Sequence, residues 1–111
     1  MATGLVLVVT TVATREQALA MARDLVERRL AACAQITAIE SVYRWQGAVE
    51  QDSEFHLLLK THAEGYAALE AAIRTQHPYE LPAIHAIATL QAHIPYAEWV
   101  EASTKPEPGA D

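Results

Sequence analysis

Two long alternating segments, joined by Gln46-Gly47, constrain the fold of this chain most strongly. Apolar and polar residues alternate over 38–45 before the joint and over 49–60 after it, which indicates a β-hairpin. Each arm is about ten residues long, whereas a typical strand has roughly five or six. Such a hairpin extends beyond a small two-layer core. Its outer half therefore requires a partner, and the simplest partner is a second copy of the same chain. The outer half carries residue types enriched at interfaces, namely Tyr43, Arg44 and Trp45.

The rest of the chain alternates between helical and strand patterns. Leu5–Thr11 is apolar on both faces and predicts a buried strand. Thr14 to Gln17 has the spacing of a capping box and predicts a helix that runs to about residue 29 or 30. A second helix is predicted over 64–75, and a last strand over 83–90. Pro95 suits the first turn of a short final helix.

This order, β-α-β-β-α-β with a short C-terminal helix, predicts an α+β ferredoxin-like sandwich. Both main helices cover one face of an antiparallel sheet, and the other face is expected to be uncovered. Because the last strand carries apolar residues on both faces, with Ile87 on the uncovered side, we expect the subunits to associate. Residues 1–102 are predicted to form one domain, and residues 103–111 a flexible C-terminal tail.

Composition excludes several classes of partner. The chain has 111 residues, half of them hydrophobic, with 14 acidic against 8 basic residues and a net charge of −6. Nucleic acid binding depends on clustered Lys and Arg, so we expect neither nucleic acid nor an anionic membrane as a partner. The apolar run at Leu5–Val9 is too short to span a bilayer and lacks the basic start of a signal peptide, so no membrane insertion is expected. Cys33 is the single cysteine, which fits a reducing compartment, and we predict a cytoplasmic protein.

His77 is the candidate metal ligand among the local motifs. It lies in TQHPYELP, beside Tyr79 and Glu80, where a neutral imidazole could bind a transition metal with help from elsewhere. The simpler interpretation is a helix end, because Pro78 disfavours helical geometry in the residue before it. Neither HExxH nor zinc-type spacing of His and Cys occurs.

The other polar residues favour structural roles. Cys33 has small apolar neighbours and is interpreted as a buried thiol. Glu50, Asp52 and Glu54 alternate along the second hairpin arm, which is more typical of a solvated edge than of a cation site. The sequence contains no glycine-rich phosphate loop, and no Ser-His-Asp arrangement can be placed in it. We therefore expect a protein that is not an enzyme.

Several segments together resemble the CutA family, named for divalent-cation tolerance. They are LAACAQI, SVYRWQGAVEQDSEFHLLLKT, HPYELPAI and the terminal YAEWV, and the match runs from about Leu5 to Val100. The resemblance implies a cytoplasmic homotrimer of ferredoxin-like subunits, in which long hairpins embrace neighbouring subunits. It places Tyr43, Arg44 and Trp45 at the trimer interface.

The resemblance also implies a link to copper and other divalent cations. The ligands proposed for some relatives are a cysteine near the end of the first strand and a His-His pair before the proline. Here those positions read Thr10, Gln76 and His77, so only His77 is retained. Copper(I) prefers sulfur ligands, which Thr10 does not supply. We therefore expect at most weak binding of Cu²⁺ or another divalent cation.

Three functional hypotheses follow. The first is a trimeric protein in the response to metal ions, with His77 and a carboxylate or neighbouring histidine as ligands. The second is a small-ligand sensor similar to the PII signalling proteins, with an intersubunit cleft lined by Trp45, Lys60, His77 and Tyr79. The third is a structural trimer that anchors a protein partner not identified by the sequence.

Overall fold

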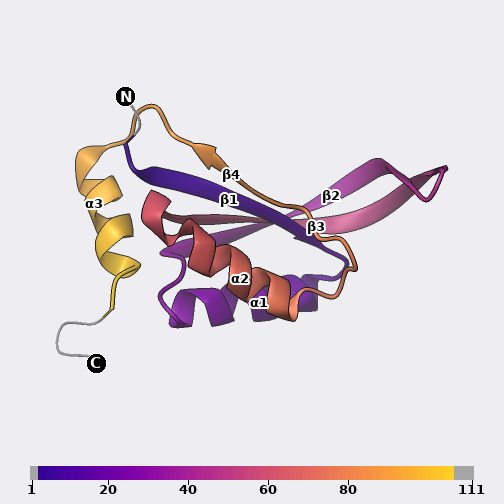
Figure 1. Ribbon diagram of the computed structural model, residues 1–111, viewed down its shortest axis with the longest axis horizontal. Helices are drawn as coiled ribbons and strands as arrows, with labels where there is room; N and C mark the ends of the chain where they lie inside the picture. Colours follow the sequence, from indigo (N-terminus) through magenta and orange to yellow (C-terminus); the bar gives the residue numbers. More distant parts are fainter. Residues whose placement is uncertain (1–2, 107–111) are drawn as a thin grey trace.

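The computed structural model describes residues 3–106 and has the predicted element order (Figure 1). The strands lie within one residue or two of the predicted positions, except that the second begins already at Cys33. The elements are β1 (Leu5–Val12), α1 (Arg15–Glu27), β2 (Cys33–Trp45), β3 (Ala48–His62), a 3₁₀ turn (Ala63–Gly65), α2 (Tyr66–Gln76), β4 (Ile84–Ala88) and α3 (Ile94–Ser103).

The four strands form one antiparallel sheet in the order β2-β3-β1-β4, which confirms the ferredoxin-like arrangement. Helices α1 and α2 lie together on one face of the sheet (Figure 1). The main core forms between this face and the two helices. Its fully buried side chains include Val8 and Leu57 from the sheet and Leu25 and Ile73 from the helices.

The β2–β3 hairpin projects away from this core (Figure 1). Its two strands have 13 and 15 residues and pair from Cys33 opposite Lys60 to Trp45 opposite Ala48. Gln46 and Gly47 both have positive φ, 49° and 83°, as a two-residue type I′ turn requires. The radius of gyration is 14.9 Å, whereas a compact chain of this length has about 13 Å. The hairpin accounts for the elongation.

Helix α1 begins as predicted and ends earlier than predicted. The Thr14 hydroxyl accepts from the Gln17 N–H, and the Gln17 side chain accepts from the Thr14 N–H, so the capping box is complete. The helix ends at Glu27 rather than at 29 or 30, because Arg29 turns into the left-handed region with a φ of 61°. This reversal directs the chain into β2.

The second face of the sheet is not uncovered throughout, contrary to the prediction. Helix α3 packs against one end of it, where Leu5, Ala32 and Val100 form a small buried cluster of their own. Elsewhere on this face, away from α3, Ile87 is 47% exposed. None of the helices within residues 3–106 is both long and apolar enough to cross a membrane.

The packed part of the chain extends beyond the predicted domain boundary at residue 102. Helix α3 ends at Ser103, and the next residue, Thr104, is buried and donates a hydrogen bond to the Val100 carbonyl. The remainder of the predicted tail, 107–111, lies outside the described residues.

Candidate functional site

A concave groove lies where the outer half of the hairpin meets the segment between α2 and β4. We call it the hairpin groove, and its cavity volume is about 890 Å³. Aromatic side chains, carboxylates and one guanidinium share its lining. The lining residues from the hairpin include Glu40, Tyr43, Arg44, Trp45 and Glu54, and those from the connecting segment include Pro78, Tyr79, Glu80 and Leu81.

Two phenol–carboxylate pairs organise the polar side of the hairpin groove. The Tyr79 hydroxyl donates to Glu54 Oε2 at 2.7 Å, and the Tyr43 hydroxyl donates to Asp52 Oδ2. Burial and the Glu54 hydrogen bond raise the pKa of Tyr79 well above its ordinary value. The hydrogen bond to Asp52 raises the pKa of Tyr43 to about 12. Both phenols therefore stay protonated at neutral pH and act as hydrogen-bond donors.

His77 joins the end of α2 to the end of β1. Its Nε2 lies 2.9 Å from the Thr11 carbonyl oxygen, and its Nδ1 lies 3.1 Å from the Tyr79 backbone nitrogen. Since a carbonyl only accepts and a backbone N–H only donates, Nε2 carries the proton and Nδ1 accepts. The His77 and Tyr79 rings are in contact, with centroids 4.9 Å apart. Burial lowers the pKa of His77, although the bond to Thr11 acts in the opposite direction.

This arrangement does not fit a preformed metal site. Both ring nitrogens of His77 already have partners: Nε2 carries the proton, and the lone pair on Nδ1 accepts from the Tyr79 backbone N–H. The other two positions implied by the resemblance do not supply ligands either. Thr10 is completely buried on the α1–α2 side of the sheet, and the Gln76 amide donates to Asp24 at 3.0 Å. Residues 3–106 contain no group of three or more His, Cys, Asp or Glu side chains placed to hold a metal ion.

The three predicted interface residues lie near the hairpin tip. Tyr43 and Trp45 are 41% and 37% exposed, and their strand register places them on one face of the hairpin. Arg44 lies on the opposite face, across from Val49. All three nevertheless line the hairpin groove, together with the predicted ligand residue Tyr79.

Lys60 lies outside this groove. It is six residues beyond Glu54 on β3, which corresponds to about 20 Å along a strand. Its ammonium group lies 5.4 Å from the centre of the Tyr96 ring in α3. The neighbouring Cys33 is half-buried rather than buried, and its Sγ lies 3.8 Å from the Tyr96 hydroxyl. Within one subunit, the structure thus does not bring Lys60 together with the other predicted cleft residues.

The sequence reasoning missed the pairing of Glu54 with Tyr79. The sequence did contain a signal for the pairing of Tyr43 with Asp52. A two-residue turn at Gln46-Gly47 sets Tyr43 opposite Glu50 and diagonal to Asp52. No comparable signal linked Glu54 to Tyr79, which is 25 residues away.

Comparisons with known proteins agree with this fold. The sequence pattern of the family described as "CutA1 divalent ion tolerance protein" matches residues 6–103. A divalent-cation tolerance protein CutA from Thermus thermophilus is 39% identical over 98 residues, which are 87% of this chain and 95% of that protein. Protein CutA from Homo sapiens is 41% identical over 86 residues. These are 77% of this chain but only 48% of the human protein.

Solved structures give the same result. The structure of CutA from Synechococcus elongatus superposes with a TM-score of 0.89 at 38% identity, covering 95% of both chains. The CutA of Xylella fastidiosa superposes with a TM-score of 0.90 at 32% identity, covering 93% of this chain and all of that one.

Proposed function

Because this chain belongs to the CutA1 divalent ion tolerance family, we propose that it acts in the response to metal ions as a homotrimer. The projecting hairpin is the observation that carries this proposal. Its exposed apolar residues include Val42 and Val49, which are 68% and 64% exposed. Among the described residues no strand pairs with the outer edge of β2. A long unpaired strand edge beside exposed apolar side chains favours association. A neighbouring copy would pair with the edge and bury the apolar side chains.

In the proposed trimer, the neighbour closes the hairpin groove. Tyr43, Trp45 and Tyr79 then become the wall of an intersubunit cleft, and Lys60 of another copy is the residue that completes it. The groove falls within the roughly 300–1,000 Å³ range of small-ligand pockets. This supports the second candidate function, a PII-like sensor of a small ligand. The third candidate, a trimer that anchors a protein partner, uses the same exposed hairpin.

Metal binding enters the proposal only in a weak form. Cu²⁺ or another divalent cation reaches His77 Nδ1 only after the hydrogen bond from the Tyr79 backbone is broken. Breaking that bond leaves a half-buried N–H without its partner, which costs about 1–3 kcal/mol. We therefore propose a low affinity, with a carboxylate or a neighbouring histidine as the second ligand.

We also propose a binding role rather than an enzymatic one, and a cytoplasmic location. The groove pairs phenols with carboxylates rather than a nucleophile with a base, which supports binding. The free thiol of Cys33 suits a reducing compartment. A relative in Arabidopsis thaliana is named chloroplastic, and a solved archaeal relative periplasmic, so fractionation of the native host is the appropriate test.

Sedimentation equilibrium of the untagged protein tests the assembly. We expect a trimer at micromolar concentration for the wild type, and dissociation for Trp45→Ala. The matched control is Leu19→Ala, which truncates a 48%-exposed apolar side chain on α1, away from the hairpin, and should remain trimeric. A folded wild-type monomer at micromolar concentration contradicts the proposal.

Calorimetric titration separates the candidate ligands. Cu²⁺ and Zn²⁺ are titrated into the wild type, His77→Ala and Lys60→Ala, and we expect weak binding that His77→Ala reduces. A tight, saturable metal site would contradict the low affinity that we propose for His77. A small anion is titrated in the same way, and binding that Lys60→Ala weakens would favour the sensor. A co-purifying protein, in the absence of both metal and anion binding, would favour the anchoring trimer.

A further inference from the structure

Helix α3 is connected to the sheet through a well-anchored residue, Thr89. The Thr89 hydroxyl donates to the Leu5 carbonyl at 2.8 Å and lies 2.6 Å from the Thr3 hydroxyl. Its backbone N–H also bonds to Leu5, and its carbonyl accepts from the Thr3 N–H. The residues between Thr89 and the start of α3 at Ile94 have no helix or strand. Thr89 is therefore anchored to the edge of the sheet, and a short irregular connection joins it to α3. A hinge requires this combination of an anchored residue and a connection without regular structure.

The apolar contact beneath α3 is small. Val100 is the one buried residue of this helix, and it packs on Leu5 and Ala32 in a cluster separate from the main core. The partly buried residues that pack against this cluster are Leu7, Tyr96 and Ala97. Ile94 and Trp99 remain 70% and 47% exposed. Segments with few buried apolar contacts open at lower free energy than the core of a domain. This contact alone secures α3 less firmly than the core secures α1 and α2.

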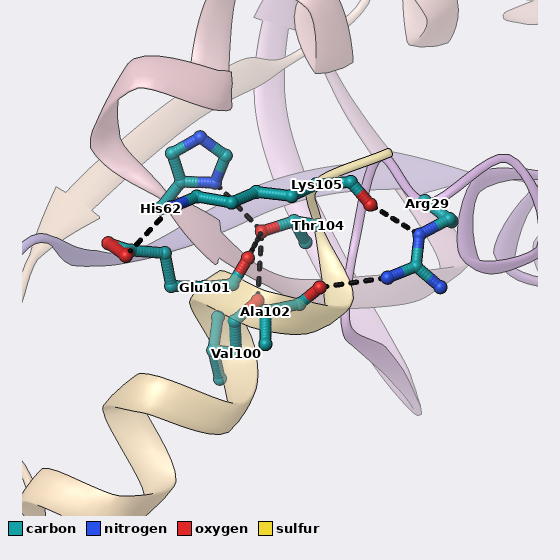
Figure 2. Close-up of polar contacts among 7 residues, drawn as sticks. All are labelled: Arg29, His62, Val100, Glu101, Ala102, Thr104 and Lys105. Atoms are coloured by element: carbon teal, nitrogen blue, oxygen red, sulfur yellow. Dashed lines mark hydrogen bonds and ion pairs between the residues drawn. The ribbon is translucent and has the colours of Figure 1, made fainter. Parts of the chain in front are cut away.

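Polar side chains from two other elements hold the free end of α3 (Figure 2). The Arg29 guanidinium donates to the Ala102 carbonyl at 2.8 Å and also to the Lys105 carbonyl. Arg29 thus reaches 73 residues along the chain to a carbonyl of the last helical turn, where a positive charge is favourable, and 76 residues to a carbonyl just beyond the helix.

Thr104 provides the second attachment. Its hydroxyl donates to the Val100 carbonyl at 2.8 Å, so its one proton is already used. His62 Nδ1, at 2.7 Å from the same oxygen, must therefore carry a proton and donate to it. Figure 2 shows Thr104 between His62 and the last turn of the helix. Gly65 leaves room for this imidazole, because an added Cβ would lie 3.0 Å from its Cε1 atom.

The backbone of Arg29 shows that its side chain is needed where it lies. At the left-handed position that ends α1, glycine is the residue that the backbone favours. Arginine is less favoured there because of its Cβ, but its guanidinium donates to two carbonyls of the C-terminal segment, and bonds from a charged donor are favourable. A residue type that the local backbone disfavours, and that contacts a segment far along the chain, indicates that the tertiary contact rather than the local conformation favours it.

We propose that α3 is a lid that opens about Thr89 as a unit, and that Arg29, His62 and Thr104 are the catch that closes it. Opening moves Tyr96 away from Cys33 and Lys60 and uncovers the buried side chains of Leu5 and Ala32. Access to this end of the sheet face opposite α1 and α2 is therefore controlled by the catch rather than by unfolding of the main core. The lid requires neither a metal ion nor the proposed trimer.

Hydrogen exchange measured by mass spectrometry on the full-length protein tests the lid. In the wild type, we expect amides of α3 to exchange faster than those of β1 and β3. The Arg29→Gly variant should accelerate exchange in α3 by roughly tenfold or more, because bonds from a charged donor are lost. It should not accelerate exchange at the end of α1, since glycine suits the left-handed position there. A purely local capping role for Arg29 predicts no change in α3.

Two further variants keep the test decisive. Thr104→Val removes the hydroxyl at nearly constant volume and should accelerate exchange in α3 without touching α1. The control is Arg28→Ala, one residue before Arg29, which removes an exposed ion pair with Asp24 and should leave exchange in α3 unchanged. Labelling of the Cys33 thiol should rise in parallel with α3 exchange. Equal exchange in α3 and β1, or equal effects of Arg28→Ala and Arg29→Gly on α3, would overturn the proposal.

Discussion

Thr10→Val should stabilise this protein, because it removes a buried hydroxyl that has no partner. Thr10 is completely buried on the α1–α2 side of β1, between its strand partners Leu57 and Ile84. Within residues 3–106 its Oγ1 makes no hydrogen bond, and Thr61 on β3 shares this property. No protein group among the described residues compensates this hydroxyl for the hydration that it lost on folding.

The expected gain follows from this environment. A buried polar group left without a partner costs about 1–3 kcal/mol. Valine has nearly the same shape, replaces the hydroxyl by a methyl group and is favoured in strands. We therefore expect the free energy of unfolding to increase by about 1–2 kcal/mol. The matched control Thr10→Ser keeps the hydroxyl and loses the methyl group, so it should lower the same quantity by about 1 kcal/mol.

Urea denaturation at equal protomer concentration measures both changes. Equal concentration matters because association stabilises the folded state by mass action. With a urea slope of about 2 kcal/mol/M, the midpoint should rise by roughly 0.5–1 M for Thr10→Val, with the slope unchanged. If Thr10→Val instead lowers the midpoint, the hydroxyl has a hydrogen-bond partner in solution and the reasoning fails.

Three more perturbations have defined outcomes. Because burial lowers the pKa of His77 below its ordinary 6.5, the unfolded chain binds its proton more readily. The stability contributed by His77 is thus present above pH 6.5 and is lost as the pH falls through the folded-state pKa. Unfolding of His77→Gln should depend less on pH in that window, and an unchanged dependence refutes the assignment. Asp52→Asn should bring the pKa of Tyr43 back from about 12 toward 10 in an ultraviolet titration, and no shift would show that the pair does not form. Gly65→Ala should destabilise the protein by more than about 1 kcal/mol in thermal unfolding, because its Cβ would lie 3.0 Å from atoms of two neighbouring side chains; a neutral result would mean that both can move.

The sequence alone was sufficient for features that depend on near neighbours in the chain. The capping box of Thr14 and Gln17, the turn at Gln46-Gly47 and the helix end before Pro78 all formed as predicted. Each rests on a hydrogen bond or steric rule that spans a few residues. The alternation of the long arms likewise determined their strand pairing, because side chains on a strand repeat every two residues.

Only the tertiary structure decided how the polar side chains are used. His77 donates to the Thr11 carbonyl, 66 residues away, and accepts from the Tyr79 backbone N–H, so the lone pair of the one ligand position retained from the resemblance is already in use. Within one subunit, Lys60 faces Tyr96 in α3 rather than Trp45. The face expected to be uncovered carries a helix held from its far end by Arg29. Periodicity shows which face a residue occupies, but its partner depends on which distant segment packs there, and that is determined by the core as a whole.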